Sequence, residues 1–124
     1  MIHVVLVAPE IPSNTGNIGR SCLAFGAKLH LVRPFGFSLA ERRLKRAGLD
    51  YWQHVDVETW DSWDVFDRHL ATLGTPFFFT AEATTTLDRV DFPTDSVLLF
   101  GSETRGLPDA LRQRPTQVSI PMID

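Results

Sequence analysis

Short apolar runs alternate along this chain with segments of helical periodicity. Residues 2–8 form a continuous valine-rich run, which is typical of a strand buried on both faces of a sheet. Similar runs predict further strands at residues 28–33, 54–57, 76–80, 96–100 and 117–120. Apolar spacing and end signals predict helices at residues 14–27, 38–46, 61–73 and 108–113. This alternation predicts an α/β fold, with a mostly parallel sheet and helices on both faces.

The chain has the length and composition of a single globular domain. Its 124 residues are 44% apolar and 22% charged, and no repeat or linker divides them. Cys22 is the single cysteine, so an intrachain disulfide is impossible and a reducing, cytoplasmic compartment is expected. The apolar start lacks the positive leader of a secretion signal, and no apolar run is long enough to span a bilayer.

Charge is distributed unevenly between the two halves. The net charge is −3, which taken alone argues against a nucleic-acid binder. Residues 1–50 nevertheless carry seven basic and three acidic groups, whereas residues 51–100 carry two basic and nine acidic groups. The basic half therefore suggests a local anionic partner. The alternative is a charged helix that is simply solvated.

The common phosphate and metal motifs are not matched. Gly16 and Gly19 lack the spacing of a dinucleotide-binding fingerprint. Residues 101–106 have the glycine spacing of a phosphate loop, but Leu107 and Pro108 stand where lysine and a hydroxyl residue are required. No paired-cysteine or histidine pattern indicates a metal site. The histidines are scattered, and those in the predicted strands are expected to be structural.

Four polar side chains are expected at the carboxyl edge of the sheet, where ligands bind in such folds. Loops at residues 9–17, 101–107 and 121–124 follow the first, fifth and last predicted strands. Asn14, Arg20, Glu103 and Arg105 lie on or near the first two loops, beside glycines that let the backbone approach a ligand. The alternative is structural: the glycines only make turns, and Glu103 pairs with an arginine.

Five stretches carry a resemblance when they are taken together. They are PEIPSNTGNIGR (residues 9–20), KLHLVRPFGF (28–37), RRLKRAGLDYW (42–52), LLFGSETRGLP (98–108) and IPM (120–122). Their order and spacing resemble those of SPOUT-class RNA methyltransferases. The chain is most similar to the TrmL/YibK-type tRNA methyltransferases, which use S-adenosylmethionine to methylate the ribose 2′-hydroxyl of the wobble nucleotide, a cytidine or modified uridine.

The resemblance implies a fold, a cofactor and partners. In this class the C-terminal part threads through a loop to form a trefoil knot, which periodicity alone does not predict because knots are rare. S-adenosylmethionine is the implied cofactor, and no metal is expected. The implied partners are a tRNA anticodon stem-loop and a second copy of the chain. Cofactor contacts carried over from the family are Phe79, Gly101, Glu103, Gly106, Ile120, Pro121 and Met122.

The resemblance also implies roles for the polar side chains. Arg20 would hold a phosphate and stabilise the developing alkoxide, because a guanidinium stays protonated and is a poor general base. Asn14 would fix the geometry around Arg20. Glu103 would order its own loop and orient arginines, including that of a partner subunit. The candidate RNA contacts are Arg20, Arg42, Arg43, Lys45, Arg46 and Arg105.

One family motif has no counterpart in this chain. After the IPM segment, family members have a serine- and asparagine-containing motif and a further helix, whereas this sequence ends at Asp124. We therefore expect a single SPOUT domain over residues 1–124 that lacks this motif and leaves the knot incomplete. The functional alternative is a non-catalytic RNA-binding or assembly module on the same scaffold.

Overall fold

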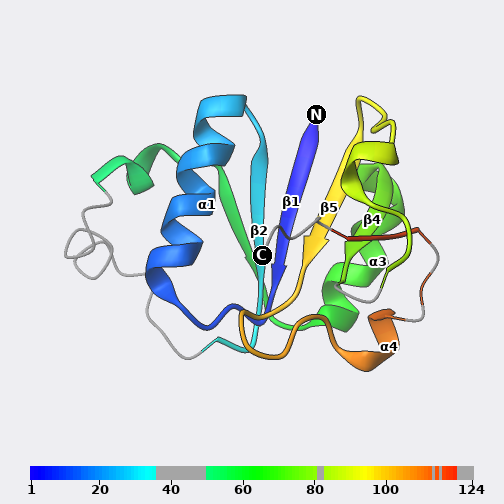
Figure 1. Cartoon of the computed structure of the whole chain (residues 1–124). Coiled ribbons are helices and arrows are strands. Elements are labelled where there is room, and N and C mark those ends of the chain that lie inside the picture. The colour runs from blue at the N-terminus through cyan, green and yellow to red at the C-terminus, as the bar shows by residue number, and fades with distance from the viewer. Residues whose placement is uncertain (36–49, 81–82, 113, 115, 120–124) are drawn as a thin grey trace, which may run out of the picture.

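In the part of the chain that the structure describes, six parallel strands form one sheet. The computed structural model describes residues 1–35, 50–80, 83–112, 114 and 116–119. The strand order is β3-β2-β1-β5-β4-β6 (Figure 1). The strands are β1 (Ile2–Val7), β2 (Lys28–Val32), β3 (Val57–Trp60), β4 (Thr75–Phe79), β5 (Ser96–Phe100) and β6 (Gln117–Val118). The predicted α/β class is confirmed.

Helical segments connect the strands. They are α1 (Pro12–Phe25), η1 (Asp50–His54), α3 (Trp63–Leu73), η2 (Leu87–Arg89) and α4 (Asp109–Arg112). Gly26 ends α1 in the left-handed conformation, as its position in the sequence predicts. Ser62 caps α3 by accepting a hydrogen bond from the backbone N–H of Val65 at 3.2 Å. None of the helices described here has the length and apolar character needed to span a bilayer.

Two predicted boundaries are wrong. The third strand runs from Val57 to Trp60 and not over residues 54–57, because residues 50–54 form the η1 turn and deliver Val55 into the core. Helix α1 begins at Pro12, two residues before the predicted start, because proline suits the first turn of a helix. The predicted helix at residues 38–46, the end of the last strand at Ile120 and the implied knot involve residues outside the described ranges.

The two faces of the sheet have separate cores. Side chains alternate along β1, so Val5 and Val7 lie on one face with α3, whereas Leu6 lies on the other with α1. The α3 core contains Phe66 and Phe78, each almost fully buried. Helices therefore cover both faces, as the alternation of strands and helices predicts.

Gly19 allows a tryptophan to pack against α1. Gly19 is buried in the middle of the helix, and a Cβ at this position would lie 2.6 Å from Cζ3 of Trp52. Trp52 is 8% exposed and joins Cys22 and Leu29 in the core beneath α1. The second glycine of the NTGNIGR stretch therefore serves helix packing.

Two histidines and a tryptophan form a buried hydrogen-bond chain between strands. The indole N–H of Trp60 donates to Nδ1 of His30 at 3.0 Å, so the proton of neutral His30 is on Nε2. The Nε2–H of His30 in turn donates to Nδ1 of His3 at 2.9 Å. Burial, followed by the influence of His3, lowers the pKa of His30 to about 4. The structural role expected for both histidines agrees with this arrangement.

We expect Gly19→Ala to destabilise the fold, although alanine favours helices. The clash with the Trp52 ring is of the kind that costs about 1–3 kcal/mol, against a helix-propensity gain of about 1 kcal/mol. The measurement is urea denaturation of Gly19→Ala in the wild-type and Trp52→Leu backgrounds. Removing the indole should abolish the loss, and an equal loss in both backgrounds would refute the packing role.

We expect acid to weaken the fold through His30. Its folded-state pKa lies below the ordinary value of 6.5, so the unfolded chain binds the proton more readily. The contribution of neutral His30 to the free energy of unfolding is thus fully present above pH 6.5. It falls by up to about 3 kcal/mol as the pH approaches about 4. Denaturation of His30→Gln should show a shallower loss between these pH values. His54→Gln, which alters an exposed histidine, is the control and should follow the wild-type curve.

Candidate functional site

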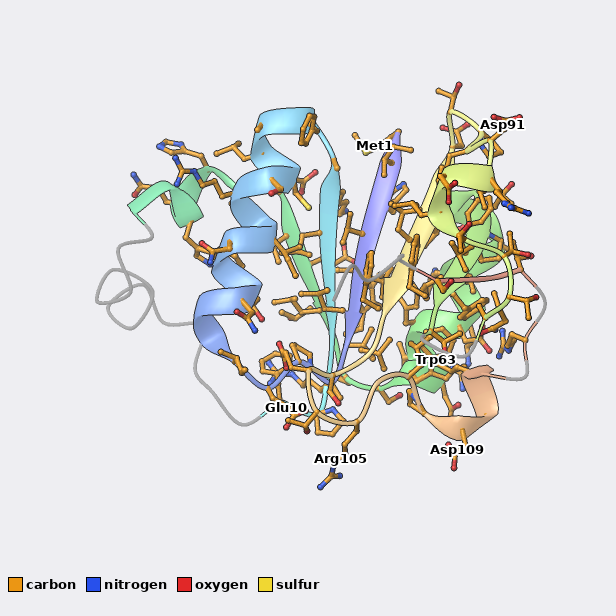
Figure 2. All side chains as sticks on the ribbon, viewed as in Figure 1. Met1, Glu10, Trp63, Asp91, Arg105 and Asp109 are labelled. Carbon is orange, nitrogen blue, oxygen red and sulfur yellow. The ribbon has the colours of Figure 1, made fainter. Side chains whose placement is uncertain are left out.

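The candidate site lies where the sheet changes its winding direction. From β1 the chain moves outward on one side to β2 and β3. It then crosses to the other side of β1, where it forms β4 and next β5, which pairs with β1. In an open parallel sheet, ligands bind beyond the carboxyl ends of the strands at such a switch point. The loops that follow β1 and β5 meet at this edge, and Figure 2 shows Glu10 and Arg105 there together.

Two carboxylates bind the loops to each other reciprocally. The backbone N–H of Glu10 donates to Oε2 of Glu103 at 2.7 Å. In return, the Glu10 carboxylate accepts from the backbone N–H of Thr104 at 3.0 Å and from its hydroxyl at 2.6 Å. We call this pair of interactions the loop clamp. It joins residues 94 positions apart in the sequence.

The loop clamp favours the ionised form of the Glu10 carboxylate. Hydrogen bonds from the Thr104 hydroxyl, and then from its backbone N–H, lower the pKa of Glu10 from the ordinary value. The side chain is exposed, so burial opposes this shift only weakly. A negative charge therefore stays at the edge of the site at neutral pH.

The loop after β5 closes on itself. Ser102 and Gly106 exchange backbone hydrogen bonds of 3.2 Å and 2.9 Å. A Cβ at Gly101 would overlap the backbone of Gly106, and Gly106 has a φ of 69°. Both glycines are therefore needed for this turn, which is the structural role that the sequence suggests as an alternative to ligand binding. Contact of Gly101 and Gly106 with a cofactor stays a prediction.

A cavity of about 390 Å³ opens between the two loops and the end of β2. Glu10 and Arg105 supply charged groups, and Phe35 supplies an aromatic ring. Its remaining lining residues are Ala8, Pro9, Pro34 and Ser102. The cavity therefore combines an apolar wall with donors and acceptors, which is the usual character of a small-molecule site.

Two larger cavities lie elsewhere, and neither combines an aromatic ring with charged groups. One of about 780 Å³ is at the opposite edge, near Gly74, and its lining includes the bidentate Asp67–Arg114 ion pair. Another, of about 510 Å³, lies between α1 and the sheet and is lined almost entirely by apolar groups. Neither lies at the switch point.

The structure places Asn14 and Arg20 in helix α1. Residues 14–17 fall in both the predicted helix at 14–27 and the predicted edge loop at 9–17. They are helical, because Pro12 begins the helix and Gly19 packs on Trp52. Arg20 is exposed and lies about 12 Å along the helix axis from Pro12. Asn14 is also exposed, but six residues of helix separate the two side chains by about 120°. They therefore lie on different faces of α1, which does not favour the role of Asn14 as a support for Arg20.

The other predicted residues are distributed unevenly. Phe79, at the end of β4, is 8% exposed and stacks on Phe100 with ring centroids 4.5 Å apart. Glu103 and Arg105 meet Glu10 at the switch point. Predicted residues that lie outside the described ranges are Arg42, Arg43, Lys45, Arg46, Ile120, Pro121 and Met122. Among the described residues, no cluster of three or more His, Cys, Asp or Glu side chains is placed to hold a metal ion.

Sequence reasoning missed three residues of this edge. Glu10 and Thr104 form one half of the loop clamp, and Phe35 lines the cavity. Glu10 follows a buried strand and a proline, and a carboxylate in that position signals an edge loop. No local signal pairs it with Thr104, because the partner lies 94 residues away.

We expect Thr104→Val to raise the pKa of Glu10 toward its ordinary value. Valine keeps the shape and the backbone N–H but removes the hydroxyl, which is the largest cause of the lowered pKa. The measurement is a carbon-detected NMR titration of the Glu10 carboxyl group. Thr72→Val is the control, because the Thr72 hydroxyl donates to the carbonyl of His69 within α3. An unchanged Glu10 pKa in Thr104→Val would contradict the loop clamp.

Comparison with known proteins places this geometry in a family. The SpoU rRNA Methylase family matches residues 1–124. The tRNA (cytidine(34)-2′-O)-methyltransferase of Methylovorus glucosotrophus is 41% identical over 126 residues, which cover 99% of this chain and 81% of that protein.

Two solved structures are also similar. One, described as "Structural insights into the 2-OH methylation of C/U34 on tRNA", is 45% identical with a TM-score of 0.92, covering 100% of this chain and 82% of the other. The other is AviRb from Streptomyces viridochromogenes in complex with the cofactor AdoMet. It is 25% identical with a TM-score of 0.78, covering 98% of this chain and 51% of the other.

Proposed function

We propose a function from one premise: the chain belongs to the SpoU rRNA Methylase family. It is a tRNA methyltransferase that transfers a methyl group to the ribose 2′-hydroxyl of nucleotide 34, a cytidine or uridine. The observation that carries this conclusion is the structural match at a TM-score of 0.92 and 45% identity to a protein described as methylating C/U34 of tRNA. The Methylovorus relative, named for cytidine 34, supports the same position.

S-adenosylmethionine is the proposed methyl donor. AviRb binds this cofactor, and its fold superposes on 98% of the present chain. The cofactor has no terminal phosphate, so a site for it needs neither the lysine nor the hydroxyl that residues 107 and 108 lack. The loop at residues 101–107, with its close backbone packing at Gly101, offers main-chain groups for this role. When bound, the cofactor supplies an already activated methyl group.

The enzyme must align the ribose oxygen with the methyl group and help the hydroxyl lose its proton. Arg20 is the proposed group for this second task. Its guanidinium stays protonated, so it acts by holding a neighbouring phosphate and stabilising the developing alkoxide. Its exposure on α1 leaves the side chain accessible to RNA. Glu103 acts as a positioning residue in this proposal through the loop clamp. Asn14 is not given that role, because it lies on a different face of α1 from Arg20.

A second copy of the chain is proposed as a partner. Arg20 lies in the middle of α1, whereas Glu103 lies on the loop that follows β5. A homodimer would let Arg20 of one subunit meet the loop of the other, as the family resemblance implies. The tRNA anticodon stem-loop would bind through Arg105 and the basic segment that contains Arg42, Arg43, Lys45 and Arg46.

The test of this function is methyl transfer to a tRNA anticodon stem-loop. The chain, radiolabelled S-adenosylmethionine and an RNA with cytidine or uridine at position 34 are mixed, and the modified nucleoside is identified by mass spectrometry. A 2′-O-methylated nucleotide 34 is expected. Binding of both RNA and cofactor without any transfer would favour the alternative, a non-catalytic module on the same scaffold.

We expect Arg20→Lys to lower turnover by roughly 10²-fold or more, because an ammonium cannot reproduce the bidentate contact of a guanidinium. The affinity for S-adenosylmethionine, measured by calorimetry, should change little. Arg68→Lys, on α3, is the matched control and should keep wild-type turnover. Full turnover in Arg20→Lys would show that the bidentate contact is not needed.

A further inference from the structure

We propose that the cavity of about 390 Å³ at the switch point holds the base of the nucleotide that is methylated, stacked on Phe35. This inference rests on the proposed function, because it assumes an RNA substrate. Base stacking on an aromatic side chain is a common way of holding unpaired nucleotides, and position 34 lies in a single-stranded loop of tRNA.

Phe35 is well placed to act as a stacking surface. It lines the cavity and is half-buried, and it packs against the core under α1, which fixes the ring. The guanidinium of Arg33 lies over the ring, with Cζ 4.7 Å from the ring centroid, and Arg33 does not line the cavity. The Arg33 guanidinium therefore lies against the ring, and the ring also forms part of the cavity wall.

The polar end of the cavity suits the edge of a pyrimidine. The ionised carboxylate of Glu10 accepts hydrogen bonds from the backbone N–H and the hydroxyl of Thr104, and the Ser102 side chain also hydrogen-bonds to it. A carboxylate has about four lone-pair sites. An acceptor is left for the exocyclic amino group of cytosine or for the N3–H of uracil. Arg105 lines the same cavity and carries the donors that a pyrimidine carbonyl oxygen needs.

The position of the cavity agrees with the chemistry at its rim. Ser102 and Arg105 belong to the loop proposed to meet the cofactor, and Glu10 belongs to the loop that leads into α1 and Arg20. A base seated between these loops would hold its own ribose beside both elements. The cavity volume lies within the range of about 300–1,000 Å³ that is usual for small ligands.

The experiment compares two RNAs on three proteins and one control variant. Fluorescence anisotropy measures the binding of an anticodon stem-loop that carries either cytidine or an abasic ribose at position 34. The proteins are the wild type, Phe35→Leu and Phe35→Trp. Leucine keeps the apolar packing but removes the aromatic face, whereas tryptophan keeps it. Phe92→Leu is the matched control, because Phe92 is a half-buried phenylalanine that packs on Phe77 and lies outside the cavity.

We expect Phe35→Leu to weaken binding of the cytidine RNA about tenfold or more and to leave the abasic RNA almost unaffected. Phe35→Trp should restore the affinity, and all three proteins should bind S-adenosylmethionine equally. An equal loss for both RNAs, or no loss for either, would overturn the base pocket while the methyltransferase function stands. A wild-type protein that binds neither RNA would overturn the proposed function and this pocket with it.

Discussion

The parallel pairing of β1 with β5 is the constraint on which the rest of this structure depends. The two strands pair from Ile2 with Ser96 to Leu6 with Phe100, although 94 positions separate the paired residues. This register ends both strands at the same edge, so the loops that follow them face each other. The reciprocal bonds of Glu10 and Glu103 become possible only there. A shift in register would separate the loops and open the cavity between them.

Glycines in the stretches at residues 14–20 and 101–106 allow close packing within the fold. Gly19 provides room for the indole of Trp52, and Gly101 provides room for the backbone of Gly106. In each case the missing side chain lets two parts of the protein approach closely. Exposed polar side chains beside these glycines, such as Arg20 and Glu103, are the groups proposed for the chemistry of the site.

The polar groups of the chain are divided between a buried set and an edge set. His30 is buried neutral between Trp60 and His3, where it joins the strands and has no path to a ligand. Glu10 is held ionised and exposed at the switch point. The difference follows from location in the sheet: polar groups inside must satisfy one another, whereas those at the carboxyl edge remain available to a substrate.

The sequence by itself determined the α/β class, most strand positions and the helix stop at Gly26, because periodicity and capping depend on residues a few positions apart. Its motifs also indicated the methyltransferase family. Only the tertiary structure decided that α1 begins at Pro12, that Asn14 and Arg20 lie on different faces, and that Glu10 pairs with Thr104. The third strand was misplaced for the same reason, because η1 packing under α1 sets where it begins. Contacts across 94 residues arise from strand order, and no local pattern records that order.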